Sequence, residues 1–300
     1  MPDPAVWLEA GAKALLYTSL LLLIGANGLR WLLLPRCEEG LGPVRIRQLE
    51  PSLARLALRA ALCALGACAL RVWTHTVSAF GFADANWDNL KLIALQSRWG
   101  QSWKLQAAAA VIAVIACAAA GRWRAAWLFE TLAVLLFTAT IPLLGHAAGD
   151  ALRVGLHGVH ILAAGIWLGS LAVTLLLRIS NVERDSAART ATRHIRLTIL
   201  RQFWPVALPS AATTAVAGLV AAYLYVGTLS NLWTTAYGRM LLLKVALVGA
   251  VAGCGFVNWR RLRRTIPNET GSLAIVLLEA FLAVAVVLVT ALLTETGHPG

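Results

Sequence analysis

The chain has 300 residues, of which 59% are hydrophobic and 13% are charged, and its formal net charge is +12. An ordinary soluble domain carries about 25% charged residues, so this chain could not cover its apolar side chains with a polar surface in water. The basic residues lie in short clusters at the ends of apolar segments and do not form one face. This pattern excludes nucleic acid as an expected partner and indicates a lipid bilayer.

Eight apolar segments are long enough to cross a bilayer as helices, because the hydrocarbon core is about 30 Å thick and each helical residue rises about 1.5 Å. Strands of a membrane barrel would appear as short alternating segments instead. The sequence therefore predicts an all-α, polytopic membrane helical bundle that forms one membrane domain over residues 1–300. In chain order, the predicted transmembrane helices cover residues 13–35, 52–73, 103–121, 123–145, 154–177, 202–228, 238–259 and 272–294.

Arginines are concentrated in alternate connections between these segments. The first, third, fifth and seventh connections contain 16 arginines, whereas the opposite side has eight lysines and arginines. Because positive residues are retained on the cytoplasmic side, this bias predicts both termini on the outer side, which is the periplasm in a Gram-negative cell. The first apolar segment is longer than the hydrophobic region of a cleavable signal peptide, so we expect it to stay as a span.

Small residues predict where helices approach closely. Gly165-x-x-x-Gly169 and Gly249-x-x-x-Gly253 are the pattern that lets neighbouring membrane helices pack with little separation. The third and fourth predicted spans are joined by only a short break, so we expect them to form a helical hairpin.

The placement of the histidines is the most informative feature of the chain. His157 and His160 are three residues apart, which puts both imidazoles on one helical face, about 4.5 Å apart along the axis. His146, at the end of the preceding predicted span, can supply a third nitrogen, and His75 is a candidate fourth ligand. Neutral imidazole suits copper and zinc, and copper(II) binds more strongly than zinc. The histidines therefore predict a metal site, most simply for a copper ion, on the outer face.

Ionisable residues within or beside the spans are candidates for supporting roles. Asp150 would either orient a ligating imidazole through its second nitrogen or cap the fifth predicted helix. Glu279 is the deepest acid of the last span, and it would accept a proton, pair with Lys244 or take part in a cation path. A structural ion pair between Glu279 and Lys244 is the simpler alternative, and the sequence leaves both open.

Several motifs that would favour other functions are missing from the sequence. There is no phosphate-binding glycine loop followed by lysine, so nucleotide hydrolysis is not expected. Met1 and Met240 are the two methionines, too few for a ladder of thioether ligands for copper(I). No catalytic arrangement of serine, histidine and acid or of paired carboxylates is recognisable, so we do not expect an enzyme.

These residues resemble the copper resistance protein D family of inner-membrane proteins. The resemblance is strongest over residues 140–294, and its most specific part is His157-x-x-His160 followed by Trp167-x-Gly169. It is also carried by Gly-His-Ala-Ala at 145–148, by Tyr-Gly-Arg at 237–239, and by Leu-Glu-Ala at 278–280.

The resemblance implies an eight-helix inner-membrane protein that takes copper from the periplasm and passes it to the cytoplasm. It makes His146, His157 and His160 the natural copper-ligand candidates. Trp167, Asp150, Lys244 and Glu279 are further candidates for the second shell or the ion path. Such proteins often work with a small periplasmic copper-binding protein of the CopC type, which would be a separate chain here.

Two alternatives remain open from the sequence. A haem-binding membrane cytochrome would need axial histidines on different helices, and His75 with His160 is the pair that would serve. A copper-delivery or assembly factor that does not transport copper would carry the same outer-face site.

Overall fold

The computed structural model describes residues 4–145, 147, 149–177, 186–263 and 269–297. Within these ranges the chain forms helices and turns and no β-strand. This confirms the all-α prediction. A helix satisfies its own backbone hydrogen bonds, which a lipid environment requires.

Seven helical segments of the described chain are long and apolar enough to cross a membrane. The eighth predicted span corresponds to α13 (Glu269–Leu293), of which the apolar part Leu278–Leu293 falls short of that length. The protein is therefore a multi-pass membrane protein, and the count of eight remains a prediction. The seven segments are Pro4–Leu33, Pro43–Phe80, Arg98–Ala120, Ala126–Leu144, Ala151–Leu176, Trp204–Val226 and Ala236–Arg261.

Three of these segments contain a change of helix type, and the others are single α-helices. Helix α1 (Pro4–Asn27) continues into η1 (Gly28–Leu33), and α6 (Ala126–Thr140) continues into η4 (Ile141–Leu144). Helix α7 (Ala151–Ala164) continues through η5 (Gly165–Gly169) into α8 (Ser170–Leu176). The single helices are α3 (Pro43–Phe80), α5 (Arg98–Ala120), α10 (Trp204–Val226) and α12 (Ala236–Arg263).

The remaining elements lie at the ends of the long helices. They are η2 (Pro35–Cys37), α2 (Glu38–Leu41), α4 (Trp87–Lys91), η3 (Leu92–Gln96), α9 (Ser186–Arg201) and α11 (Asn231–Thr234). Helix α9 was not predicted, because the segment is too polar to cross a membrane. It packs against α8, α2 and α12, and it buries Ile195 and Ile199.

Two helices extend more than two turns beyond the predicted spans. Helix α1 begins at Pro4, not near residue 13, and α3 covers Pro43–Phe80 where residues 52–73 were predicted. The predicted spans cover the mostly apolar part of each helix, and charged residues lie at or beyond their ends. In the structure several of these charges are paired inside the protein, so the helices continue past them.

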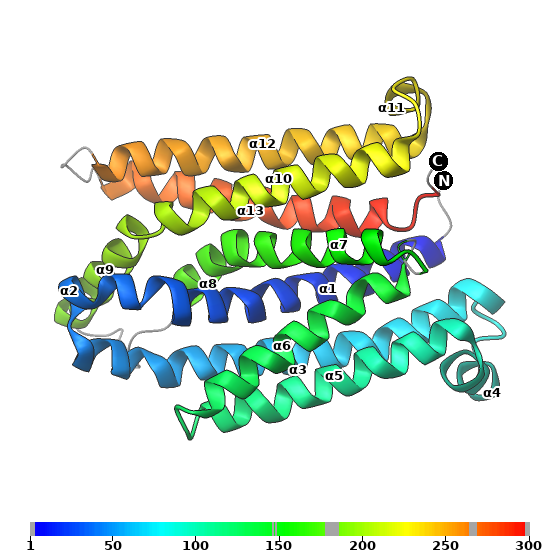
Figure 1. The fold of residues 1–300 in the computed structure, drawn as a ribbon, viewed down its shortest axis with the longest axis horizontal. Coiled ribbons are helices and arrows are strands. Elements are labelled where there is room, and N and C mark those ends of the chain that lie inside the picture. The colour runs from blue at the N-terminus through cyan, green and yellow to red at the C-terminus, as the bar shows by residue number, and fades with distance from the viewer. Residues whose placement is uncertain (1–3, 146, 148, 178–185, 264–268, 298–300) are drawn as a thin grey trace.

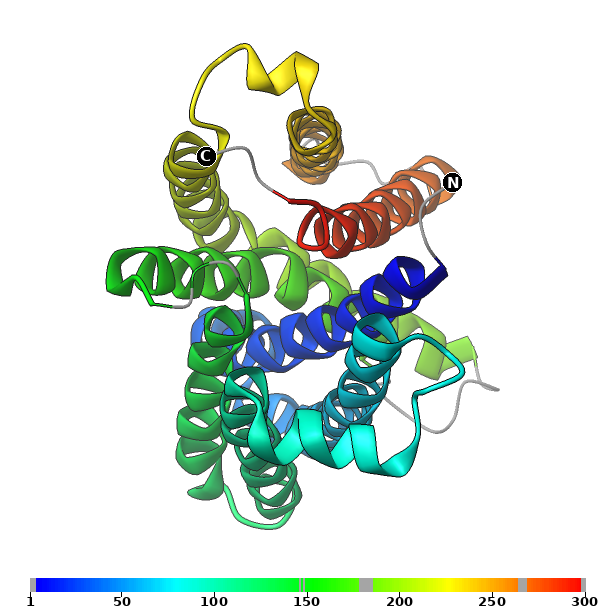
Figure 2. The same cartoon turned by 90° about the vertical axis from the view of Figure 1, so that its right-hand side faces the viewer.

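Helices α1 and α7 lie between two groups of helices (Figures 1 and 2). On one side α3 packs against α1 and α5, and α5 forms the predicted hairpin with α6. On the other side α10 packs against α7, and α12 packs against α13. The start of α1 and the end of α13 lie at the same end of the bundle (Figure 1). We call this the terminal end, and we call the other end, where α2 and α9 lie, the opposite end.

One of the two predicted glycine motifs makes a close helix contact. A Cβ atom added to Gly169 would overlap the backbone of Leu21, and one added to Gly25 would overlap the backbone of Gly169. The prediction was wrong for Gly249 and Gly253, because no described atom lies within 4 Å of the position of an added Cβ. Of the two predicted motifs, the one at Gly165 and Gly169 thus joins η5 to α1, whereas Gly249 and Gly253 make no close contact among the described residues.

Candidate functional site

A cavity of about 110 Å³ opens at the terminal end of the bundle. Side chains from α1, α3, α7, α10 and α12 and from the end of α13 line it, so all these helices meet there. The volume is large enough for a few water molecules or a partly hydrated ion. The polar side chains of its wall are Lys13, Tyr17, Arg71, His157, Tyr225, Tyr237 and Thr294.

His157 forms part of the cavity wall. Its ring stacks on the ring of Tyr225 from α10, with 5.9 Å between centroids and an angle of 20° between planes. The guanidinium of Arg153, one turn earlier on α7, also contacts this tyrosine and lies 5.0 Å from the centre of its ring. Tyr225 therefore holds the imidazole at the wall.

His160 lies one turn deeper in α7 and contacts α10. Its Nδ1 is 3.0 Å from the carbonyl oxygen of Thr214. A carbonyl oxygen only accepts hydrogen bonds, so Nδ1 carries the hydrogen, and in the neutral ring Nε2 keeps its lone pair. Metal-binding histidines are commonly oriented in this way by a carbonyl oxygen. The nearby Lys244 amino group interacts electrostatically with His160.

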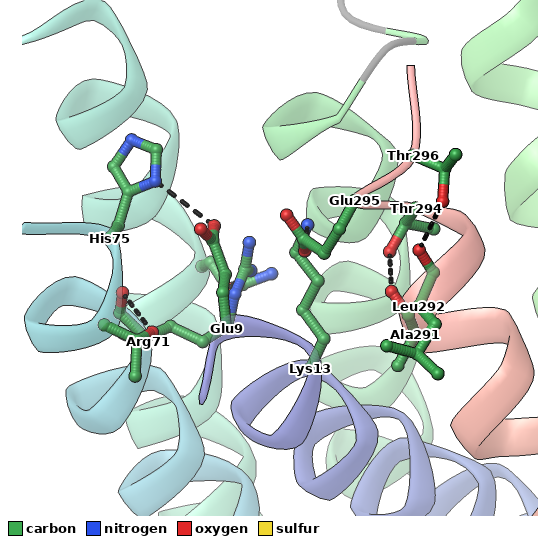
Figure 3. A network of polar contacts seen from close by, with 11 residues as sticks. Glu9, Lys13, Arg71, His75, Ala291, Leu292, Thr294, Glu295 and Thr296 are labelled. Carbon is green, nitrogen blue, oxygen red and sulfur yellow. Dashed lines mark hydrogen bonds and ion pairs between the residues drawn. The ribbon is translucent and has the colours of Figure 1, made fainter. Parts of the chain in front are cut away.

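His75 makes different contacts, which Figure 3 shows in part. Its Nδ1 is 3.2 Å from Oε1 of Glu9, and its ring stacks on Trp99 at 4.2 Å between centroids. These contacts tie α3 to the start of α1 and to the start of α5. Neither of these contacts involves another histidine.

The predicted convergence of four histidines is only partly visible in the described chain. His146 lies outside the described residues, although its neighbour Gly145 lines the cavity. Among the residues that the structure describes, no group of three or more His, Cys, Asp or Glu side chains lies close enough to hold a metal ion. Of the four predicted ligands, His157 and His160 lie on the same helix, α7, one turn apart.

Two acidic side chains, Glu9 and Glu295, lie near the two cations of the cavity wall, Lys13 and Arg71 (Figure 3). Lys13 forms an ion pair with Glu295, and Arg71 donates to Oε1 of Gln106 at 2.9 Å. Glu9 interacts electrostatically with both Lys13 and Arg71. Burial raises the pKa of Glu295 above its ordinary value, although Lys13 opposes this effect. This network was not predicted. The feature of the sequence that points to it is the presence of Glu9 and Lys13 in the first turns of α1.

The other candidate residues have separate places. Asp150 caps α7, since its Oδ1 accepts from the backbone nitrogens of Leu152 and Arg153 at 2.9 and 3.2 Å. Trp167 and Glu279 line a second cavity, which also has a volume of about 110 Å³. In the described part of the chain, no ion pair joins Glu279 to Lys244.

Comparison with protein families gives two matches that cover most of the chain. Residues 1–152 match the family described as copper resistance protein D-like, N-terminal domain, and residues 197–293 match the family described as copper resistance protein D. The first match alone covers more than half of the 300 residues.

A curated relative is the copper transport protein CutJ of Bacillus subtilis (strain 168), which is 25% identical over 305 residues. The alignment covers 97% of this chain and 53% of the relative, so the chain spans about half the length of that protein. No solved structure matches the chain. The family matches at both ends, together with the apolar helices between them, show that this chain belongs to the copper resistance protein D family.

Proposed function

We propose that this membrane protein takes copper ions at the terminal end of the bundle and carries them across the membrane. The terminal end faces the periplasm, the membrane is the bacterial inner membrane, and eight helices cross it. The excess of arginine in the connections at the opposite end supports this orientation. Family membership and the name of the curated relative support copper as the transported ion.

The observation that carries the proposal is the placement of two imidazoles on one face of α7. His157 lines the cavity, and His160 lies one turn deeper with its Nδ1 committed to Thr214. An ion that enters the cavity meets His157 first and then the free Nε2 of His160. His146, next to the cavity-lining Gly145, is the third ligand of the proposed site.

His75 has a supporting position in this proposal and is not needed as a ligand. Its bond to Glu9 and its stacking on Trp99 fix the start of α1 against α3 and α5. The two carboxylates of Glu9 and Glu295 balance Lys13 and Arg71, so an entering cation does not meet unpaired positive charge. A separate periplasmic protein of the CopC type would deliver copper at this end.

The size of the cavity favours a small ion over haem. Pockets for drug-sized ligands have volumes of about 300–1,000 Å³. The terminal cavity has about 110 Å³, which suits a metal ion with a few ligands or waters. Freshly purified protein is therefore expected to lack a Soret absorption band.

Copper binding by purified histidine variants tests the proposed site. We expect the double variant His157→Ala and His160→Ala to bind copper at least about tenfold more weakly, which corresponds to about 1.4 kcal/mol. His194→Ala is the matched control, because His194 is exposed on α9 at the opposite end. Equilibrium dialysis followed by metal analysis gives the affinity. Undiminished binding by the double variant would refute the site.

A further inference from the structure

The second cavity lies in the opposite half of the bundle from His157. Its wall comes from η5, α9, α10, α12 and α13, and its volume is about 110 Å³. Aromatic rings form much of this wall: Trp204 stacks on Trp259 with 4.4 Å between centroids, and Phe256 lies 5.6 Å from Trp259. Trp167, a predicted candidate for the second shell or the ion path, belongs to this wall.

Glu279 places a carboxylate in this aromatic cavity. The residue is 3% exposed, and its Oε1 lies 3.2 Å from the position that a Cβ atom on Gly255 would take. Among the described residues, no hydrogen bond or ion pair is found for this carboxylate. Asn258, which is 6% exposed, brings an amide to the same cavity.

A buried carboxylate needs a compensating charge. Removing it from water costs free energy, so the group either takes up a proton or binds a cation. The described residues that line the cavity include no lysine, arginine or histidine and no second acid. Among the described residues that line the cavity, none supplies a positive charge to this carboxylate, so a bound proton or an entering cation can supply it.

We propose that Glu279 and Asn258 form a second cation site, in the half of the bundle opposite to His157, that a copper ion occupies on its way out. The carboxylate and the amide oxygen are the ligands, and the faces of Trp204 and Trp259 add the attraction of aromatic rings for cations. When the site is empty the carboxyl carries a proton, which leaves when the ion binds. The copper assignment rests on the proposed function, whereas the cation site itself does not.

The chemistry of the ligands suits an exit site. Imidazole nitrogens are preferred copper ligands, whereas carboxylate and amide oxygens are preferred by harder ions. Copper therefore binds more weakly at Glu279 than at His157 and His160. An ion passed from the histidines to this site is released more readily from it.

The test counts copper ions bound per chain by equilibrium dialysis in lipid nanodiscs of phosphatidylethanolamine and phosphatidylglycerol. Copper(II) alone is the probe in one series, and copper(I) kept reduced with ascorbate is the probe in a parallel series. In the background of His157→Ala and His160→Ala, we expect one weak site to remain and tryptophan fluorescence to be quenched as it fills. Adding Glu279→Gln should weaken this site at least tenfold and remove the quenching.

Glu130→Gln is the matched control. Glu130 is also a buried carboxylate on a membrane helix, but its Oε1 accepts from Asn27 at 3.1 Å and it does not line the cavity. We expect it to keep the weak site. Gly255→Ala provides a second route if Glu279→Gln does not fold, because the added methyl group presses on the Glu279 carboxylate and should weaken the site several-fold.

Three outcomes decide the inference. Loss of the weak site in Glu279→Gln or in Gly255→Ala, with Glu130→Gln unchanged, supports it. Unchanged stoichiometry and quenching in the Glu279 and Gly255 variants overturn it. If the histidine variant instead keeps the full affinity of the wild type while Glu279→Gln loses binding, the outer histidine site fails and the second site stands.

Discussion

The imidazole of His160 is oriented by a backbone carbonyl and not by another side chain. The carbonyl of Thr214 fixes which nitrogen carries hydrogen, and the stacking of Tyr225 fixes the ring of His157. The sequence predicted the pair from its spacing of three residues. It could not predict Thr214 or Tyr225 as their partners, because which helix faces α7 depends on packing between residues that are more than 50 positions apart.

Charge balance at the cavity mouth leads to a prediction at the residue scale. Glu9→Gln removes one of the two carboxylates near Lys13 and Arg71, so the mouth becomes net positive and should repel copper ions. We expect a several-fold lower initial rate of copper binding at low salt, and a smaller effect at high salt because ions screen the charge. Stopped-flow quenching of tryptophan fluorescence measures this rate.

Glu39→Gln serves as the control for this experiment, because Glu39 is exposed on α2 at the opposite end. It makes the same change of charge far from the mouth. An equal loss of rate in both variants would mean that the network of Glu9 and Glu295 does not guide the ion.

At the scale of elements, hydrophobic length predicted the spans better than it predicted their ends. The membrane helices were found because their apolar cores exceed the thickness of the hydrocarbon layer. The predicted spans left out the first turns of α1, which carry Glu9, and the last turns of α3, which carry His75, and these two side chains contact each other in the structure. Such pairs form between distant residues, and no local pattern reveals them.

The contact between α1 and η5 gives the prediction at this scale. A methyl group at Gly169 would overlap the backbone of Leu21, so Gly169→Ala forces α1 away from the helix that carries the histidines. Overpacking of this kind costs about 1–3 kcal/mol. We expect a lower midpoint of thermal unfolding in detergent, together with weaker copper binding.

Gly249→Ala is the matched substitution, since the position of its added methyl group has no described atom within 4 Å. Its unfolding midpoint should stay the same or rise slightly, because alanine favours a helix over glycine. A loss of stability as large as that of Gly169→Ala would show that close packing of α1 on η5 is not the cause.

At the scale of the whole molecule, the bundle joins two cavities of similar volume that lie in opposite halves. Among the described lining residues, the first cavity has one histidine, three tyrosines and two cations, and the second has one carboxylate among aromatic rings. The chain spans about half the length of the curated relative. Both cavities are lined by residues of this chain.

The proposed orientation makes a prediction at this scale. With eight crossings and the arginine-rich end inside, both termini face the periplasm. Alkaline phosphatase fused after residue 300 should therefore be active, whereas green fluorescent protein at the same position should not fluoresce. The reverse pattern would place the histidine cavity on the cytoplasmic side.

Copper uptake into proteoliposomes tests the central claim most directly. Vesicles that contain the wild-type protein should accumulate copper faster than protein-free vesicles. Vesicles with His157→Ala and His160→Ala should lose most of this difference, while those with His194→Ala should keep it. Uptake by the double variant at the wild-type rate, with equal amounts of folded protein in the membrane, would contradict the account.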